Sequence, residues 1–437
     1  MNPLASELNA VIEDSCPALF GMLSQLGKEL YFPRGILTQT AEAREKAYRY
    51  DATIGIARSG GEAMHLESVT RLVKGLSPDQ ALDYAPATGN PGLRRAWLGE
   101  MGRKNRSLSG REISLPVVTS GITHGLTITG ELFVDPGDVV LLPDKYWGNY
   151  GMIYGVRRGA NIRTFPFFTG SGGFDIDGMA AALEEVLSEK GKALLLLNFP
   201  NNPTGYSIKK GEAGELAQAL TSVTGPGRDA VVVVDDAYFG LFYDDDVLPE
   251  SVFGLLAGES EHLFPVKLDG ATKEMYVWGF RVGFITFSAL AGGREKEVYT
   301  ALEKKVGGTI RGNISNCPQL SQSILLEAIG DPDFADQAGE KLQLMKSRAL
   351  KVREVLDNPD YAEVWKPYPF NAGYFMCLRL NDVDAEELRV RLLEQYGVGV
   401  IAEGKDIRIA FSSLEVDEIP DIFDIMYRCA IEMKRGA

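Results

Sequence analysis

The sequence predicts an α/β protein: a large domain with a mostly parallel sheet flanked by helices, plus a smaller α+β domain. Two observations lead to this prediction. Apolar runs alternate with amphipathic runs through the middle of the chain, and the pattern changes after residue 330. Strands that are apolar on both faces and separated by helices are typical of a parallel sheet covered on both sides. At 437 residues, the chain is also too long for one ordinary core.

The first predicted elements are two helices, over residues 4–30 and 36–50, joined by a loop at YFPRG (31–35). The alternating region holds three apolar strands and two amphipathic helices. The strands are VVLLP (139–143), ALLLLNF (193–199) and AVVVVDDAY (230–238), and the helices cover 175–191 and 209–223. Gly191 closes the first of these helices, as glycine commonly does. We therefore expect the strands side by side, with helices on both faces.

Beyond residue 330 the sequence indicates a second, smaller α+β domain. A long helix over 334–357 is followed by short strands and two more helices. Because chain termini often lie close together, the N-terminal segment is expected to join this domain. We therefore divide the chain into an N-terminal arm with part of the small domain (1–60), a large domain (61–330) and a small C-terminal domain (331–437).

Composition argues against several classes of protein. The formal net charge is −15 and no basic block offsets it, which argues against a surface for nucleic acid or for an anionic membrane. No run of about 18 apolar residues occurs, so we expect no transmembrane helix. The N-terminus, MNPLASELNAVIEDSCPALF, lacks a basic leader followed by an apolar core, so we expect no secretory signal.

The cysteines and histidines are few and scattered. They are Cys16, Cys317, Cys377 and Cys429, and His65, His124 and His262. Cysteines without pair spacing are typical of a reduced cytoplasm and not of a disulfide framework or a zinc site. We therefore expect a cytoplasmic protein without a metal site of the usual nitrogen and sulfur ligands.

Polar side chains stand where two predicted strands end. ALLLLNF runs into NNPTG (201–205), and AVVVVDDAY contains Asp235, Asp236 and Tyr238 at its end. Ligands of open α/β sheets bind at the carboxyl ends of the strands, so we expect both ends at one binding edge. The alternative is that NNPTG is only a strand–helix turn and that Asp235 caps a neighbouring element. Two polar strand ends on the same edge favour a binding site.

A candidate anion site lies at TSGITHGL (119–126), which follows an apolar pair and opens a helix. The hydroxyls of Ser120 and Thr123, with the free N–H groups of the helix start, form a cradle suited to an anion. Plain helix capping is the alternative. Neither G-x-G-x-x-G nor G-x-x-x-x-G-K-[ST] occurs, so the sequence does not indicate a dinucleotide or Walker-type site.

A candidate nucleophile lies in DGATKEMYVWGFRVGF (269–284), where Lys273 occupies a Gly/Ala/Thr turn eight residues before Arg281. A lysine is ordinarily a solvated surface residue, but apolar and aromatic residues follow Lys273. Burial lowers the pKa of a lysine and makes its amine a usable nucleophile for forming an imine. Arg281 has the guanidinium fork that suits a phosphate. Lys267, in the strand-like PVKLD, is a competing lysine, and the sequence is equally compatible with a position in which it faces solvent.

Together these segments resemble the class I and II aminotransferases, which are pyridoxal-phosphate enzymes of the aspartate aminotransferase fold (fold type I). The matching motifs follow in order over most of the chain. They are GNPGLRRAW (89–97), YWGNY (146–150), NNPTG, DDAYFG (235–240), the Lys273 segment, RGNISNCPQ (311–319) and IRIAFSSL (407–414). The resemblance implies that pyridoxal 5'-phosphate binds in the large domain and that the enzyme moves an amino group between an amino acid and a 2-oxo acid.

The resemblance also implies roles for particular residues. Lys273 would bind the cofactor covalently, Asp235 (and not Asp236) would face the pyridine nitrogen, and Tyr238 would face the 3-oxygen. Further cofactor contacts are implied for Gly121, Ile122, Thr123, Trp147 (stacked on the ring), Asn202 (at the 3-oxygen), Arg281 (at the phosphate) and, from the neighbouring subunit, Tyr84 and Ser315. Substrate contacts are implied for Gly55, Asn202, Arg311 and Arg408, of which Arg408 would hold the α-carboxylate.

The sequence departs from the family pattern at the phosphate end. Gly270 stands where a serine is usual, so we expect one hydroxyl to the phosphate to be missing, with Thr272 or Thr123 as the substitute. Ile122 stands where small residues are common, and His124 follows it. These departures remove no essential chemical group, and they indicate a divergent branch of the family.

The resemblance further implies a substrate class and an assembly. Arg311 matches the position that recognises a second carboxylate in aspartate aminotransferases, which implies a dicarboxylate partner such as aspartate, glutamate or 2-oxoglutarate. The alternative for Arg311 is an ion pair at a dimer interface, and aromatic residues such as Tyr374 leave room for an aromatic or aliphatic substrate. Tyr84, Arg311 and Ser315 match positions that cross a two-fold interface, so a homodimer with shared active sites is implied.

Two other functions compete with transamination. A pyridoxal-phosphate-dependent lyase or decarboxylase on the same fold would use the same lysine and begin with the same proton chemistry. A ligand-sensing domain of a transcription regulator would need a DNA-binding module, but the residues before the family match carry no basic helix-turn-helix signal.

Overall fold

The protein is described from a computed structural model, which describes residues 2–15, 17–30 and 36–436. Within that part of the chain, seven strands form one sheet in the order β4-β10-β9-β8-β7-β5-β6. They are β4 (Val117–Thr119), β5 (Val139–Pro143), β6 (Asn161–Phe165), β7 (Lys192–Asn198), β8 (Asp229–Asp235), β9 (Leu263–Gly270) and β10 (Gly283–Phe287). β10 runs antiparallel to both of its neighbours, and the other pairs are parallel. The predicted α/β class with a mostly parallel sheet is confirmed.

The run of leucines in β7 serves both faces of this sheet. Leu195 and Leu197 belong to one apolar cluster, and Leu194 and Leu196 belong to another. Successive side chains of a strand point to opposite faces, so a strand buried on both sides has to be apolar throughout. α9 (Ile176–Lys190) and α10 (Lys210–Val223) contribute to the first cluster, and α8 (Ile122–Phe133) and α13 (Glu295–Asn313) contribute to the second.

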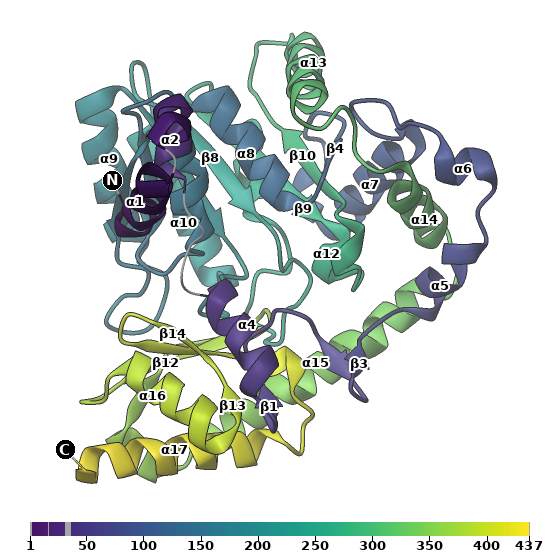
Figure 1. The fold of residues 1–437 in the computed structure, drawn as a ribbon. Coiled ribbons are helices and arrows are strands. Elements are labelled where there is room, and N and C mark those ends of the chain that lie inside the picture. Colours follow the sequence, from purple (N-terminus) through teal and green to yellow (C-terminus); the bar gives the residue numbers. More distant parts are fainter. Residues whose placement is uncertain (1, 16, 31–35, 437) are drawn as a thin grey trace.

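A second sheet follows in the C-terminal part of the chain. Its strands, again within the described residues, are ordered β11-β12-β15-β14. The strands are β11 (Trp365–Pro367), β12 (Phe375–Leu380), β14 (Ile401–Glu403) and β15 (Asp406–Ala410), with α15 (Phe334–Leu356), α16 (Ala385–Arg391) and α17 (Ile419–Gly436) around them. Figure 1 shows these green to yellow elements gathered at one end of the large sheet.

Part of the N-terminal segment packs with these C-terminal elements (Figure 1). α4 (Ile36–Lys46) contacts β13 (Val398–Gly399), and β1 (Tyr50–Asp51) pairs with β13 in parallel. This packing agrees with the expectation that residues from both ends of the chain share one domain. The domain boundaries near residues 60 and 330 remain a prediction.

Further elements lie between or beside these units. They are the hairpin β2 (Arg58–Ser59) and β3 (Glu62–Ala63), and the helices α5 (Glu67–Thr70), α6 (Pro78–Leu82), α7 (Pro91–Lys104), α11 (Val252–Leu256), α12 (Ala271–Glu274) and α14 (Gln319–Ile329). α14 packs against α6 and α7 beside the large sheet. None of the helices in the described residues has both the length and the apolar character needed to cross a bilayer.

The prediction of one helix over residues 4–30 was wrong. The chain forms α1 (Pro3–Ser15), α2 (Pro17–Met22) and α3 (Gln25–Glu29) instead. Proline starts a helix well but interrupts one, so Pro17 begins a new element. Ser24 then caps α3 by accepting a hydrogen bond from the Gly27 N–H. The loop predicted at YFPRG (31–35) lies outside the described residues.

The other predicted elements agree more closely with the structure. The predicted helix 36–50 ends at Lys46, because the chain turns into strand β1 at Tyr50. The strand over 139–143 is found as predicted, and the helices over 175–191, 209–223 and 334–357 are found within one residue at either end. Strand β8 ends at Asp235, so Asp236 and Tyr238 lie in the turn that follows it.

Candidate functional site

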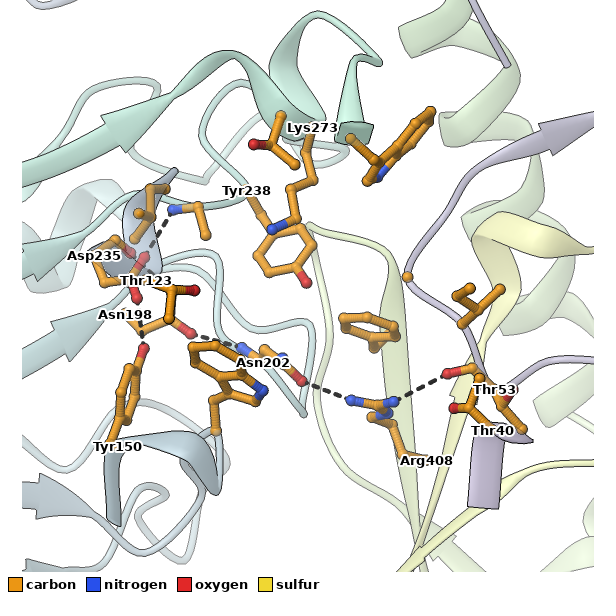
Figure 2. Close-up of a pocket in the computed structure, with 18 of the residues that line it drawn as sticks. Thr40, Thr53, Thr123, Tyr150, Asn198, Asn202, Asp235, Tyr238, Lys273 and Arg408 are labelled. Carbon is orange, nitrogen blue, oxygen red and sulfur yellow. Dashed lines mark hydrogen bonds between the residues drawn. The ribbon is translucent and has the colours of Figure 1, made fainter. Parts of the chain in front are cut away.

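A cavity of about 390 Å³ opens where β7 and β8 end, between the two sheets. Figure 2 shows its lining residues converging from both sheets and from α4. It is lined by these residues that the sequence predicted for the site: Gly55, Ile122, Thr123, Trp147, Asn202, Asp235, Tyr238, Lys273, Arg281 and Arg408. Four other predicted residues, Gly121, Tyr84, Arg311 and Ser315, lie outside this set and are described below.

The NNPTG turn holds Asn202 at the cavity through a chain of hydrogen bonds. β7 and β8 pair so that Asn198 lies beside Asp235, and the Asn198 amide donates to the Asp235 carbonyl oxygen over 2.8 Å. The Asn202 N–H then donates to Asn198 Oδ1 over 2.8 Å. Thr204 donates from both its N–H and its hydroxyl to Asn201 Oδ1. Asn198 is a site residue that the prediction missed, although an amide at the end of an apolar strand was a usable signal.

The Asp235 carboxylate is buried and points into the cavity. The Tyr150 hydroxyl donates to its Oδ2 over 2.7 Å, and the Ala237 N–H donates to its Oδ1 over 3.1 Å. Burial raises the pKa of Asp235, and the hydrogen bond from Tyr150 and the charge of Lys273 oppose this rise. Tyr150 lies within the predicted YWGNY motif, but nothing in its sequence position indicated a contact with Asp235.

The neighbouring Asp236 lies away from the cavity, in a buried ion cluster. It accepts a hydrogen bond from the Ser251 hydroxyl over 2.6 Å and pairs with Lys267, whose ammonium lies 3.0 Å from Asp269 on the other side. Burial would lower the pKa of Lys267, but the two carboxylates outweigh it and raise that pKa. Lys267 is 1% exposed, so the solvent-facing position left open for it was wrong, because β9 lies inside the sheet between β8 and β10.

Lys273 lies in α12, which begins where β9 ends, and its amine points into the cavity (Figure 2). Its Nζ lies 4.8 Å from the centre of the Tyr238 ring. Burial lowers the pKa of Lys273 to about 8; the charge of Asp235 opposes this shift and that of Arg281 adds to it. Burial also raises the pKa of the Tyr238 phenol, which therefore stays neutral and able to donate a hydrogen bond. Lys273 is thus the lining residue suited to act as a nucleophile and a proton carrier.

One end of the cavity is suited to a phosphate. α8 begins at Ile122, after Gly121 at φ 77°. A Cβ on Gly121 would lie 2.4 Å from Nη2 of Arg281, so a glycine is needed to let the guanidinium lie against the helix start. Arg281 has no hydrogen bond or ion pair with any described residue. A helix N-terminus beside an unpaired arginine is a favourable site for an anion.

The polar groups at this end partly differ from the prediction. Thr123 and Thr272 both line the cavity, as expected for the substitutes of the missing serine at Gly270. Ser120 is not among the described lining residues, and its N–H donates to Nδ1 of His124 over 3.1 Å. Burial lowers the pKa of His124, in keeping with a neutral ring that accepts this bond. One N–H group of the predicted cradle therefore donates to the His124 ring and is not free for an anion.

The opposite end of the cavity is formed by Arg408 of β15. Its Nη1 donates to Asn202 Oδ1 over 3.0 Å and its Nη2 donates to the Thr53 carbonyl oxygen over 3.1 Å (Figure 2). The side chain is 2% exposed, and its Nε has no partner among the described residues. The guanidinium also lies over the Phe375 ring, 4.3 Å from its centre. A buried and incompletely bonded guanidinium is suited to bind a carboxylate.

Gly55 completes the wall beside Phe375. A Cβ at Gly55 would lie 2.9 Å from Cζ of Phe375 and 3.7 Å from the Tyr238 hydroxyl. Any larger residue at this position would displace the Phe375 ring. Trp147 lies on another side of the cavity, with its ring edge-on to that of Tyr150 at a distance of 5.6 Å. Aromatic rings thus form part of the cavity wall.

The three residues predicted to act across a subunit interface lie outside this cavity. Tyr84 is 89% exposed. Arg311 and Ser315 are exposed near the end of α13, where Arg311 Nη1 donates to the Ser315 hydroxyl over 2.5 Å. Their roles therefore remain a prediction that depends on a second subunit.

The described residues fit pyridoxal phosphate at each point that the chemistry requires. Arg281 lies against the helix start at Gly121 and is suited to a phosphate, and the buried Asp235 carboxylate, the Trp147 ring and Lys273, whose pKa is lowered, line the same cavity. No three described His, Cys, Asp or Glu side chains gather where they could hold a metal ion. Fold and site together define a pyridoxal-phosphate enzyme of fold type I.

Sequence comparison identifies the family. The chain belongs to the family Aminotransferase class I and II, which it matches over residues 56–424. It is therefore a pyridoxal-phosphate-dependent aminotransferase. It is 23% identical over 349 residues to an aspartate aminotransferase of Sulfurisphaera tokodaii, covering 76% of this chain and 79% of the relative. It is 28% identical over 321 residues to a 2-aminoadipate transaminase of Thermus thermophilus, covering 72% of this chain and 71% of the relative.

Other comparisons extend this picture. A putative aminotransferase of Bacillus subtilis is 29% identical over 174 residues, so the matched part spans 40% of this chain and 41% of that relative. Among solved structures, an aminotransferase from Anaerococcus prevotii shares the fold with a TM-score of 0.84, at 24% identity and covering 94% of this chain and 99% of the other. At that identity the likeness shows the fold alone.

We predict that Lys273, and not Lys267, binds the cofactor. Borohydride reduction of the holoenzyme followed by peptide mapping should place the pyridoxyl group on Lys273, because Lys267 is paired and buried behind the cavity. The neutral amine is the nucleophile, so capture of the cofactor by the apoprotein should quicken as the pH approaches about 8 and level off above it. A label on Lys267 would overturn the assignment. The variant Lys273→Ala should be folded and inactive.

We predict that substitutions of the two adjacent aspartates affect different properties, catalysis for Asp235 and stability for Asp236. Asp235→Asn should lower kcat by about a hundredfold or more, because it removes the charge that faces the cavity. Asp236→Asn should lower the free energy of unfolding of the apoprotein by about 1–3 kcal/mol, since Lys267 keeps only one of its two carboxylate partners. Urea unfolding and steady-state assays of both variants check this. A crippled Asp236→Asn enzyme beside an active Asp235→Asn enzyme would show that the register is wrong.

Proposed function

We propose that this aminotransferase uses a dicarboxylate, such as aspartate, glutamate or 2-oxoglutarate, as one of its substrates. The observation that carries the recognition of an α-carboxylate is Arg408, a buried guanidinium whose Nε has no partner among the described residues, at the end of the cavity away from the phosphate cradle. An α-carboxylate is a suitable partner for it. Two similar proteins are named an aspartate aminotransferase and a 2-aminoadipate transaminase, and these names support a substrate with a second carboxylate in its side chain.

In this proposal one group of cavity residues holds the cofactor and another acts on the substrate. Pyridoxal phosphate, when bound, supplies an aldehyde for an amine and a ring that accepts electrons. Arg281 and the start of α8 hold the phosphate, and Trp147 provides a stacking surface for the ring. Asp235, fixed by Tyr150, presents a negative charge that keeps a pyridine nitrogen protonated.

The remaining residues act on the substrate. Arg408 orients the α-carboxylate, and the Lys273 amine takes the proton that leaves the α-carbon, which its pKa of about 8 suits. Asn202 already accepts a hydrogen bond from Arg408 through Oδ1, so its amide nitrogen is the group left to donate to the cofactor's 3-oxygen. Tyr238, which stays neutral, donates beside it.

We also propose that the working unit is a homodimer whose active sites are completed across a two-fold axis. The exposure of Tyr84 and the position of Arg311 and Ser315 outside their own chain's cavity support this proposal. A two-fold interface is self-complementary, so both sites would receive the same residues from the opposite chain. Arg311 would then approach the distal carboxylate of a substrate in the neighbouring site.

We propose a cytoplasmic location as well. The described cysteines Cys317, Cys377 and Cys429 are free and buried, which supports a reducing compartment.

The substrate proposal predicts the outcome of a screen of amino donors and 2-oxo acids. With glutamate or aspartate as donor, the enzyme should form a new amino acid from a 2-oxo acid, and with aspartate as donor 2-oxoglutarate should have a higher kcat/KM than pyruvate. Chromatography of the amino acids formed measures both, with Lys273→Ala as the inactive control. Release of carbon dioxide or ammonia without a new amino acid would indicate a decarboxylase or lyase. Transamination confined to donors and acceptors with a single carboxylate would refute the dicarboxylate.

The dimer proposal predicts complementation between inactive chains. Lys273→Ala chains mixed with Tyr84→Ala/Arg311→Ala chains should regain about a quarter of the wild-type activity, because half of randomly mixed dimers are mixed and one of their two sites is intact. Ultracentrifugation verifies the dimers. A monomeric active enzyme, or verified mixed dimers without regained activity, would contradict the proposal.

A further inference from the structure

Helix α4 forms part of the cavity wall, although it precedes the family match that begins at residue 56. Its residues Thr40, Ala41 and Arg44 line the cavity. Positions separated by three and four residues lie on one face of a helix, so these side chains form a single stripe directed at the cavity. Packing of α4 against β13 and β14 fixes that face. The wall is therefore a feature of this chain that the matched family region does not supply.

Arg44 is unpaired, unlike the other basic residues around α4. Lys46 lies 3.9 Å from Glu394, Arg49 lies 3.7 Å from Asp421, and Arg389 bonds Glu42 over 2.9 Å. Arg44 itself has no hydrogen bond or ion pair with any residue that the structure describes. Its side chain is exposed at the cavity mouth, whereas Arg408 is buried deeper inside. A guanidinium there is free to meet an incoming ligand.

α4 and Arg408 lie on the same side of the cavity. Arg408 donates to the carbonyl oxygen of Thr53, which follows α4 by a few residues. Figure 2 shows Thr40 and Thr53 together beyond the Arg408 guanidinium, away from Lys273 and Asp235. A substrate whose α-carboxylate is held by Arg408 therefore lies close to the wall that carries Arg44.

The charges of the cavity leave one cation without a counterpart. Among the described lining residues, Lys273, Arg281, Arg408 and Arg44 are basic and Asp235 is acidic. Under the proposed function, Arg281 pairs with a phosphate and Arg408 pairs with the α-carboxylate of the substrate. Asp235 pairs with a protonated pyridine nitrogen. Lys273 is a carrier of protons with a lowered pKa. Arg44 is then the basic lining residue left without a negatively charged partner, so the charge pattern favours a substrate with a second negative group.

We propose that Arg44 recognises the distal carboxylate of an acidic amino-acid substrate from within the same subunit. This inference rests on the proposed function, in which Arg408 holds the α-carboxylate. The planar guanidinium fork matches a carboxylate in two parallel hydrogen bonds. Ile54 and Phe375, which also line the cavity, provide apolar surface for the methylene groups between the two carboxylates. Arg44 would then set the preference for acidic over neutral substrates, either alone or together with a partner's Arg311.

Binding of inert acids to the holoenzyme tests this inference without turnover. Glutarate carries two carboxylates and butyrate carries one on a chain of similar length, so the ratio of their affinities measures recognition of the second carboxylate. Isothermal titration calorimetry should show that Arg44→Gln lowers this ratio about tenfold, the effect of losing a charge-assisted contact at a partly screened site. Arg44→Glu should lower it further, and Arg44→Lys should retain part of it.

Lys46→Gln is the matched control, because it removes a cation from the same helix but does not line the cavity. It should leave the ratio unchanged, and thermal unfolding should show both variants to be folded. An unchanged ratio in Arg44→Gln, or a loss in Arg311→Gln alone, would overturn the inference. Failure of acidic amino acids and dicarboxylic 2-oxo acids to transaminate would instead contradict the proposed function, and the calorimetry would still decide the role of Arg44.

Discussion

The pairing of β7 with β8 is the constraint on which the active site depends. Its register places Asn198 beside Asp235, and the hydrogen bond between them fixes the ends of both strands. Asn198 in turn holds the Asn202 backbone, and Asn202 meets Arg408 from the second sheet. A shift of one residue in β8 would exchange the faces of Asp235 and Asp236 and would direct the wrong carboxylate at the cavity. The geometry of the site therefore depends on the pairing of these two strands.

Two adjacent carboxylates at the end of β8 have different roles, and each has its own partners in the structure. Asp236 turns toward a buried ion cluster, where Lys267 and Ser251 compensate for the loss of water. Breaking such a cluster by removing one partner is costly, since a buried charge is left unpaired. Asp235 turns the other way, and Tyr150 and a backbone N–H hold it without a cation in direct contact. Its charge thus stays available to a ligand in the cavity.

The same arrangement explains the state of Lys273. Its amine is withdrawn from water beside the Tyr238 ring, without a carboxylate bonded to it, so its pKa falls to about 8. Lys267, also withdrawn from water, has two carboxylates beside it and keeps its charge. Burial alone therefore does not make a lysine reactive; burial without an anionic partner does. The two lysines lie six positions apart in the sequence and differ in chemistry for this reason.

Local patterns in the sequence determined much of this protein. Apolar runs identified the strands, and polar strand ends and turns located Asn202, Asp235 and Lys273, because such patterns are encoded by neighbouring residues. Arg408 was located by the resemblance of its motif to the family, and all four residues line the cavity. Only the tertiary structure decided that Tyr150 supports Asp235, that Lys267 is buried, and that α4 brings Arg44 to the cavity mouth. These contacts join distant segments, as the Arg408–Asn202 bond does across 206 positions. Which distant segments meet depends on how sheets and helices pack together, and spacing along one chain does not encode that.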